Sequence, residues 1–566
     1  MILTPSSSTR TSMRPRSTSL GRPALALAVL LTGTVPAAAP LSAQADWTPV
    51  AAGYPRTAAE ESGFQRHTRH DEMWDYLEQL RGVSIEMRLG TYGETRDGRR
   101  LPYAVFSRPL VSEPWEAWTL ERPVLVLAAN VHGDERTFRE GLLVLMRDMA
   151  TPGTEANGLL DDLVVVVAPQ INPDGFEASE EGQRGNAWGI DLNRDYVKLE
   201  HPSIQGYVEN LIGAYRPHLF VDGHNGGSYP YNLNYQCTSA FDPAPELTDL
   251  CDDGIFPAID ARLGTEGYRS YYYQRGNAQE WLTGGWQARI GRNYGGFANS
   301  VAILFEAPEV QSMEDGARAG YLGYLSVMDW SARHADELMG TVRDARLETL
   351  ALGDEPGGQV AVQQDYEPED EPATYDIMAG SQEEIRAALR EGRAPEVRTI
   401  TNGRLMKKPV ATVLRDRPYA YLLPRDAADA VAMLRRHGIT VERLLEPREL
   451  QVEAYTVAGV TYEQAYNHAA ATRVEVGDVI TVRREFPAGT YMVSTAQMLG
   501  RLAAHMLEVE TDDNVVYWNT MDAWLPRPGQ GTDGGFGQQR DQGPPLVPIF
   551  KVMRPTALPT LMVEER

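Results

Sequence analysis

The stretch PVLVLAANVHGDERTFREGLLVLMRDMA, residues 123–150, joins two apolar segments of different spacing through a polar turn. The first segment, Pro123 to Val131, is short, rich in Val and Leu and does not alternate, as in a strand covered on both faces. In the second, Phe138 to Ala150, apolar residues recur at helical spacing. The stretch therefore predicts a buried strand, a turn and a helix that packs on the sheet.

Three further apolar runs have the same character as the first. They are LVVVVAPQI (Leu163 to Ile171), HLFVDGH (His218 to His224) and SVAILFE (Ser300 to Glu306). Such runs alternate with helical patterns from Phe64 to Gly340, which is typical of an α/β fold. We expect a mixed, largely parallel sheet flanked by helices, followed by a smaller C-terminal accessory region.

The N-terminal residues have the order of a secretory signal peptide. Basic residues precede the apolar stretch ALALAVLL (Ala24 to Leu31), and Ala43-Gln44-Ala45 follows as a small-x-small cleavage site. The apolar stretch is too short to span a bilayer as a stable helix. We expect residues 1–45 to be removed and the protein to be periplasmic or extracellular, with no membrane span after removal.

The rest of the 566-residue chain exceeds what one core usually accommodates. We expect a catalytic domain over 64–340, an acidic linker rich in Gly, Pro and Gln over 351–374, and an accessory region over 375–566. Within the accessory region, SQEEIRAALREG reads as a helix, and DAADAVAMLRRHGITVERL reads as a helix, a Gly stop and a strand. The low-complexity segment 526–545 reads as a surface loop.

Composition excludes several classes of function. The formal net charge of -25 repels phosphate backbones, so nucleic acid is not an expected partner. Only two cysteines occur, Cys237 and Cys251, which excludes a disulfide scaffold and a four-thiolate zinc site. The two cysteines either form one disulfide that closes a loop or remain free thiols.

An H-x-x-E string occurs three times, and its context distinguishes the copies. The copies that begin at His334 and His505 sit inside helical patterns, where an ordinary surface or half-buried His is the expected reading. The copy formed by His132 and Glu135 follows a buried strand and precedes a helix, where open α/β sheets bind their ligands. Both side chains can therefore point at one metal ion.

A third ligand is expected from the end of another strand. His224 ends the run HLFVDGH and precedes a turn, so its imidazole is free to reach the metal. His201 and His218 compete less well, because His201 precedes a proline in a polar stretch and His218 lies at the entrance of its strand. Glu306 ends a fourth strand and can reach the same edge as a general base.

These residues resemble the zinc carboxypeptidases of the carboxypeptidase A-like type. The strings HGDE, NPDG (Asn172 to Gly175), DLNRDY (Asp191 to Tyr196), His224 and FEAPE appear in that family's order. The resemblance covers roughly Phe64 to Gly340. It implies one Zn²⁺ per chain held by His132, Glu135 and His224, with Glu306 as general base and acid.

The resemblance also implies roles for residues near the Asn-Arg pair. Asn193 and Arg194 match the pair that holds the terminal carboxylate of the peptide, and Arg184 matches the arginine that stabilises the oxyanion. Asp191 matches the carboxylate that orients the first zinc-binding His. A mobile tyrosine of the family has two possible counterparts here, Tyr273 and Tyr294.

The sequence departs from the family pattern at two further places, since Asp195 follows the Asn-Arg pair and Asn-Gly-Gly follows His224. The expected function is an exported zinc metallocarboxypeptidase that acts on peptides, with no expectation about its oligomeric state. Two alternatives remain open at this point. One is a zinc amidohydrolase of the aspartoacylase-like branch, a deacylase, and the other is a non-catalytic binding module.

Overall fold

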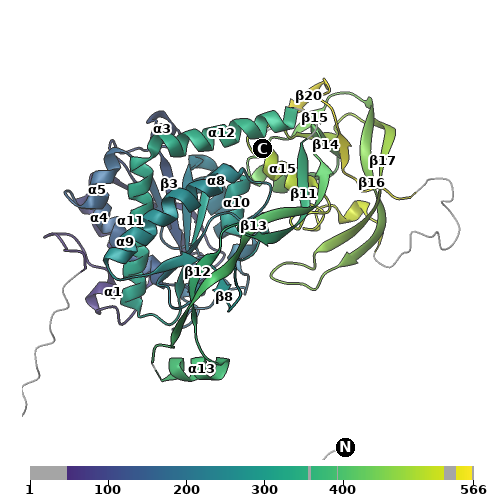
Figure 1. Cartoon of the computed structure of the whole chain (residues 1–566). Helices are drawn as coiled ribbons and strands as arrows, with labels where there is room; N and C mark the ends of the chain where they lie inside the picture. The colour runs from purple at the N-terminus through teal and green to yellow at the C-terminus, as the bar shows by residue number, and fades with distance from the viewer. Residues whose placement is uncertain (1–46, 355–357, 392, 528–543, 564–566) are drawn as a thin grey trace, which may run out of the picture. The chain divides into compact units, whose positions relative to one another are not determined.

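The central sheet has eight strands, and its four middle strands are parallel (Figure 1). A computed structural model describes residues 47–354, 358–391, 393–527 and 544–563. The middle strands are the four apolar runs, so the prediction of a mixed, largely parallel sheet is confirmed. In sheet order the strands are β1 (Met87–Glu94), β2 (Arg100–Phe106), β4 (Val164–Ala168), β3 (Val124–Ala129), β5 (Leu219–Gly227), β10 (Val301–Pro308), β6 (Leu233–Gln236) and β7 (Ser270–Tyr272).

Helices flank this sheet, as expected. The predicted helix is α4, and it packs against α11 as well as against β3 and β5. The longer helices are α2 (His70–Val83), α4 (Thr137–Ala150), α9 (Phe256–Thr265), α11 (Met313–Arg333) and α12 (Ala335–Asp354). The shorter ones are α1 (Ala58–Glu61), α3 (Pro114–Thr119), α5 (Glu155–Gly158), α6 (Pro173–Phe176), α7 (Pro202–Tyr207), α8 (Pro245–Asp249) and α10 (Gly291–Phe297).

Strand β3 contributes to a different core on each face, which explains its continuous apolar sequence. Val124 and Val126 belong to one buried cluster, whereas Leu125 and Leu127 belong to another. Successive side chains of a strand point to opposite faces, so a strand covered on both sides must be apolar at every position.

The expected linker over 351–374 is corrected by the structure. Helix α12 extends to Asp354, and strand β11 (Gln359–Pro368) pairs with β13 (Val397–Asp416). Val360, Ala361 and Val362 are buried at the start of this strand, and their burial favours strand formation there. The acidic and proline residues elsewhere in the segment are typical of a linker. Strand β13 also pairs with β12 (Ala373–Met378) and β9 (Glu280–Leu282), and β9 pairs with β8 (Arg275–Gly276).

The C-terminal region, meaning the described residues from 358 onward, contains a seven-stranded sheet. Two predictions within it agree with the structure, because helix α13 (Gln382–Arg390) and helix α14 (Ala428–Arg436) form where expected. Gly438 has a φ of +82° just after α14, and β15 follows. In sheet order the strands are β17 (Thr472–Phe486), β16 (Arg448–Tyr462), β19 (Phe550–Val552), β14 (Ala420–Leu423), β18 (Tyr491–Ser494), β15 (Glu442–Leu444) and β20 (Thr560–Met562), and a further helix is α15 (Gly500–Leu507).

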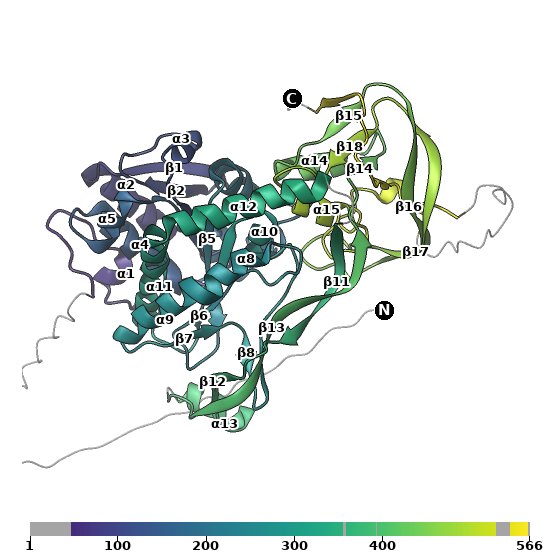
Figure 2. The ribbon, with the colours of Figure 1, turned by 45° about the horizontal axis from the view of Figure 1, so that its top comes forward.

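The C-terminal region and one face of the central sheet share a core. Val126 and Phe220 of the central sheet belong to the same buried cluster as Tyr421, Leu507 and Trp518. Figure 2 labels β5, β14 and α15, which carry Phe220, Tyr421 and Leu507. Such a shared apolar cluster stabilises the two regions jointly, since burial of each depends on the other.

Three further observations bear on the sequence predictions. Cys237 and Cys251 form a disulfide with a Cα to Cα distance of 6.3 Å.

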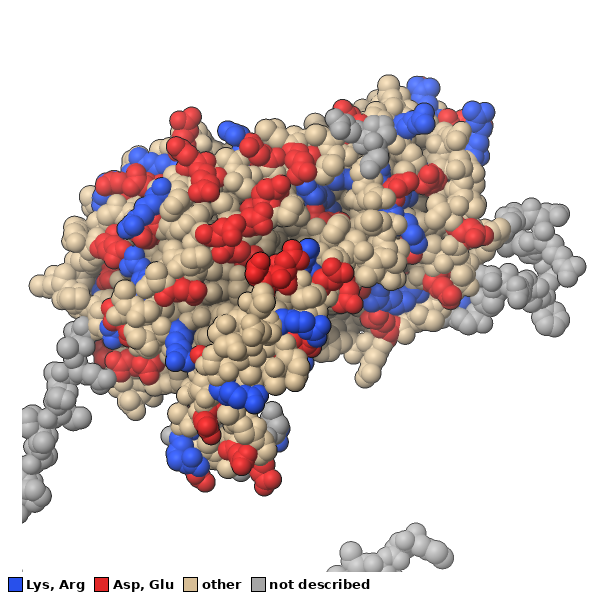
Figure 3. All heavy atoms as spheres, in the orientation of Figure 1, with Lys and Arg blue, Asp and Glu red and all other residues tan. Residues whose placement is uncertain are grey.

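The proposed signal peptide, 1–45, and most of the low-complexity segment, 526–545, lie outside the described residues. Within the described residues, none of the helices combines the length and the apolar character needed to cross a membrane. On the face in Figure 3, acidic and basic side chains are interspersed.

Candidate metal centre and substrate cavity

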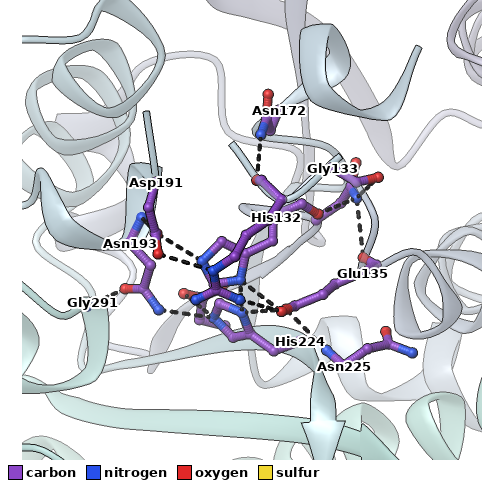
Figure 4. A network of polar contacts seen from close by, with 12 residues as sticks. His132, Gly133, Glu135, Asn172, Asp191, Asn193, His224, Asn225 and Gly291 are labelled. Carbon is purple, nitrogen blue, oxygen red and sulfur yellow. Dashed lines mark hydrogen bonds and ion pairs between the residues drawn. The ribbon is translucent and has the colours of Figure 1, made fainter. Parts of the chain in front are cut away.

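Three buried side chains converge at the C-terminal ends of β3 and β5 (Figure 4). His132 Nδ1 lies 2.9 Å from Glu135 Oε1, and His224 Nδ1 lies 2.8 Å from Glu135 Oε2. The two imidazole Nδ1 atoms are 3.2 Å apart. The candidate ligand atoms all lie within 4.8 Å of one another, so one ion can contact all three.

The turn after β3 brings His132 and Glu135 together. Asn130 adopts a φ of +60°, and its side-chain amide donates hydrogen bonds to the carbonyls of His132 (2.7 Å) and Glu135 (3.0 Å). At Gly133 the backbone is so close to α6 that a Cβ there would lie 2.2 Å from the carbonyl carbon of Gly175. This position therefore requires glycine.

Each imidazole also faces a carboxylate on its far side. His132 Nε2 lies 2.8 Å from Asp191 Oδ1. His224 Nε2 lies 2.9 Å from Asp222 Oδ2, a residue that the sequence interpretation missed. The signal was present, because residues two apart on a strand point to the same face, and Asp222 precedes His224 by two.

Buried charges in the cluster shift one another's pKa values. Burial raises the pKa of Glu135, but the adjacent imidazoles outweigh it and hold that pKa well below the ordinary value. Burial lowers the pKa of His224, but Asp222 and Glu135 outweigh it and hold that pKa well above its ordinary value. Two imidazole nitrogens and a carboxylate, all buried, form a donor set that fits zinc.

Glu306 lies beside this cluster because β10 pairs with β5 in parallel, with Glu306 directly opposite His224. The residue is only 6% exposed, and its Oε2 has no hydrogen-bond partner among the described residues. Burial, and next the negative charge of Glu135, raise the pKa of Glu306 to about 8. A buried, unpaired carboxyl group therefore borders the candidate metal centre.

The remaining predicted site residues come from the segment between β4 and α7. Arg184 contacts Glu135 Oε1 through Nη1 (2.9 Å) and Asp191 Oδ2 through Nε (3.0 Å). Asn193 accepts a hydrogen bond from the Gly291 amide (2.9 Å), and its amide nitrogen lies 3.4 Å from His224 Nε2. Arg194 Nη1 donates to the Asn193 carbonyl (2.8 Å). All three line the same cavity.

The departure at Asp195 has a structural explanation. Its carboxylate accepts hydrogen bonds from the backbone amides of Glu200 (3.1 Å) and His201 (2.8 Å), and the residue is fully buried. Burial raises the pKa of Asp195 to about 6, although the nearby His468 opposes this shift. Asp195 thus stabilises the loop that follows the Asn-Arg pair.

The competing residues are separated by the structure. Tyr273 lines the cavity, whereas Tyr294 is buried outside the cavity lining and its hydroxyl lies 3.1 Å from His437 Nδ1. His201 Nδ1 accepts from the Ser203 amide, and His218 Nδ1 accepts from the Val124 amide, both away from the cluster. Tyr273 is therefore the better placed of the two tyrosines.

The cavity has a volume of about 510 Å³ and is lined by residues from distant parts of the chain. The C-terminal region contributes Tyr466, Arg473, Asp512 and Tyr517 to its wall. Sequence reasoning did not find these residues, because no local motif marks a contact formed across hundreds of positions. The candidate metal centre opens on this cavity, since His132 and Glu135 are among the residues that line it.

Comparison with known proteins finds similarity to carboxypeptidases. A zinc carboxypeptidase model matches residues 73–252, which include the three candidate ligands. The probable carboxypeptidase 2 of Arthroderma benhamiae is 26% identical over 452 residues, which cover 74% of this chain and 79% of that protein. Carboxypeptidase D of Mus musculus is 29% identical over 203 residues, 32% of this chain and 14% of that protein. Residues 73–252 therefore match the zinc carboxypeptidase family, and the relatives that align with more of the chain are carboxypeptidases at 26% identity.

Among solved structures, a metallo-carboxypeptidase from Pseudomonas aeruginosa has 21% sequence identity and a TM-score of 0.38. The alignment covers 48% of this chain and 70% of that chain. Glu306 lies beyond the residues matched by the family model, so its assignment depends on its position beside the cluster.

Proposed function

We propose that this chain is an exported zinc carboxypeptidase that releases the C-terminal residue of peptides. His132, Glu135 and His224 would hold one zinc ion through two Nδ1 atoms and a carboxylate, leaving room for substrate on the cavity side. A zinc ion bound there would polarise the scissile carbonyl and lower the pKa of a bound water.

The observation that carries the proposal is the buried Oε2 of Glu306, which lies beside the three candidate ligands and has no hydrogen-bond partner among the described residues. A carboxylate in this position accepts the proton of the attacking water and returns it to the leaving amine. In the metal-free site, burial and the charge of Glu135 raise the pKa of this carboxyl group to about 8, and a zinc ion bound beside it would favour the ionised form that accepts the proton.

The arginines of the cavity have distinct proposed roles. Arg194, with Asn193, binds the terminal carboxylate, since the planar guanidinium offers paired donors to a carboxylate. Arg184 stabilises negative charge as it develops on the carbonyl oxygen. Asp191 orients His132, with which it is in contact at 2.8 Å.

Export is supported by the N-terminal sequence pattern, a basic segment, an apolar segment and Ala43-Gln44-Ala45. N-terminal sequencing of material recovered outside the cytoplasm should find a chain that begins near Asp46. A mature protein that retains Met1 would contradict cleavage.

The activity is tested with one peptide prepared with a free and with an amidated C-terminus. Mass spectrometry should show loss of the terminal residue from the free form, much slower loss from the amidated form, no reaction after chelation, and recovery with zinc. Internal cleavage would contradict the exopeptidase proposal. Release of an acyl group from an N-acyl amino acid, without peptide cleavage, would favour the deacylase alternative.

A further inference from the structure

The cavity is lined by five arginines, and three of them are neutralised by carboxylates of the protein. Arg184 contacts Glu135 and Asp191, Arg289 contacts Asp513 at 2.7 Å, and Arg473 contacts Glu463 and Asp512. Arg289 and Arg473 thus have counter-ions within the protein, whereas Arg184, which is paired with Asp191, already has the proposed role at the oxyanion.

The other two cavity arginines, Arg194 and Arg292, are not neutralised in this way. Among the described residues, no carboxylate oxygen lies within 4.0 Å of either guanidinium group. Glu306, which lines the same cavity, is also farther away than this. Arg194 is half-buried and donates only to the carbonyl of Asn193. The cavity therefore presents two positive groups that have no counter-ion in the part of the chain that the structure describes.

Arg292 is the more unusual of the two because it is only 4% exposed. Its Nη2 donates to the carbonyls of Gly284 and Gly285, the latter at 2.8 Å, and lies 3.4 Å from Ser239 Oγ. These contacts hold the guanidinium in place. In the described residues, neither Nε nor Nη1 has a hydrogen-bond acceptor, and Nε is fully buried.

Burial of an uncompensated cation is unfavourable, and it lowers the pKa of Arg292. A purely structural arginine that braces the turn at Gly284 needs only its Nη2 contacts. The free Nη1 of Arg292, which unlike Nε is not fully buried, instead suits a carboxylate that enters the cavity, since charge-assisted hydrogen bonds are the strongest that a guanidinium forms.

We propose that the cavity selects peptides whose C-terminal residue is acidic. Such a residue brings two carboxylates, and the cavity offers two unpaired guanidinium groups, Arg194 for the terminal carboxylate and Arg292 for the side-chain carboxylate. A neutral terminal residue satisfies only one of them. This inference rests on the proposed carboxypeptidase function and names its substrate class.

The test compares two peptides that differ only in a terminal Glu or Gln, which have similar size and different charge. The zinc-loaded wild-type protein should show a kcat/KM about 10- to 100-fold higher for the Glu peptide, the range expected for one charge-assisted hydrogen-bonded contact. Equal values, or a preference for Gln, would overturn the inference while leaving the carboxypeptidase proposal intact. If the protein cleaves none of these peptides, and no peptide with another terminal residue, the carboxypeptidase proposal itself is refuted.

Variants then assign the preference to a residue. Arg292→Met should reduce the Glu to Gln ratio to about 1 while retaining cleavage of the Gln peptide, and Arg292→Lys should keep part of the preference. Arg343→Met is the control, because it removes an exposed arginine that is paired with Asp344 and is not among the cavity residues, and it should leave the ratio unchanged. An equal loss on both peptides in Arg292→Met would assign Arg292 a structural role and overturn the inference. If Arg292→Met fails to fold, the ratio of kcat/KM for the Glu and Gln peptides in the wild-type protein still tests the proposed selectivity.

Discussion

Both imidazoles of the candidate metal centre have the same arrangement of their two nitrogens. Nδ1 faces the ligand cluster, and Nε2 faces a carboxylate, Asp191 for His132 and Asp222 for His224 (Figure 4 shows the former). A carboxylate in that position fixes the tautomer and the ring orientation of a metal-binding His. The two histidines are thus prepared for metal binding by the surrounding protein.

Asp222→Asn tests this arrangement at the residue that the sequence interpretation missed. Loss of the carboxylate should weaken zinc affinity by about 10- to 100-fold, because His224 loses the partner that orients it. Competition with a chromogenic chelator measures the affinity. Asp344→Asn, at an exposed carboxylate paired with Arg343, is the control. Equal zinc affinities in the two variants would contradict a role for Asp222.

Glu306 should make the stability of the metal-free protein depend on pH. Its pKa is about 8 when folded against 4.5 as the ordinary value, so the folded state binds the proton more tightly than the unfolded state. The resulting stabilisation is complete below the unfolded pKa and is lost as pH rises through the folded pKa. In chelator, the Tm of Glu306→Gln minus that of wild type should therefore increase from about pH 5 to about pH 9. A constant difference would contradict the raised pKa.

At the scale of elements, the turn between β3 and α4 is held by close backbone packing. A Cβ at Gly133 would meet backbone atoms of Gly175 and Phe176 at 2.2 and 2.4 Å, and a Cβ at Gly182 would lie 2.7 Å from the Gly133 carbonyl oxygen. Because these are backbone contacts, they cannot be relieved by a side-chain rotation. The position of His132 and Glu135 depends on this turn.

Gly133→Ala should therefore destabilise the protein by about 1 to 3 kcal/mol, the usual range for overpacking, and lower its zinc content. Chemical denaturation and metal analysis measure the two effects. Gly158→Ala is the control, since a Cβ at that position would have no neighbour within 4 Å. Wild-type zinc content and stability in Gly133→Ala would show that the turn tolerates a side chain.

The sequence predicted the elements that have a strong local pattern. The four parallel strands and α4 were predictable because apolar runs and helical spacing follow from burial. Strand β11 was not, since its acidic and proline-containing end resembles a linker, and its pairing partner β13 does not begin until Val397. Local composition cannot report pairing with a distant strand.

At the scale of the whole molecule, Arg289 connects the cavity to the C-terminal region. Its guanidinium forms an ion pair with the fully buried Asp513 and donates to the Asp512 carbonyl at 2.7 Å. It also lies over the rings of Tyr517 and Trp518, 4.9 and 5.1 Å from their centres. The wall of the cavity is thereby fixed to residues far away in sequence.

Arg289→Ala should be strongly destabilising, by about 3 to 5 kcal/mol, because it leaves the carboxylate of Asp513 buried without its partner. Denaturant unfolding gives the value. Arg343→Ala removes an exposed arginine paired with Asp344, and is expected to cost about 1 kcal/mol or less. Similar small effects in both variants would show that the Arg289 pair does not hold the regions together.

Contacts between the cavity and residues distant in sequence could not be predicted from the sequence. The motif residues His132, Glu135, His224 and Glu306 were found because each follows or ends an apolar strand. Arg292, Arg473 and Tyr517 have no such context, and their relation to the cavity depends on how helices and sheets pack in three dimensions. A polar side chain in a loop or helix is usually solvated, so its burial beside a site is not evident from its neighbours in sequence.

The central claim is that Glu306 transfers protons beside a zinc ion that other residues hold. Zinc content and turnover of Glu306→Gln, measured on the same preparation, test it most directly, with Glu309→Gln as the control at an exposed glutamate three residues later. We predict zinc content like that of wild type and a rate reduced by about 10² to 10⁴-fold for Glu306→Gln, and wild-type values of both for Glu309→Gln. Turnover near the wild-type rate in zinc-loaded Glu306→Gln would contradict the account.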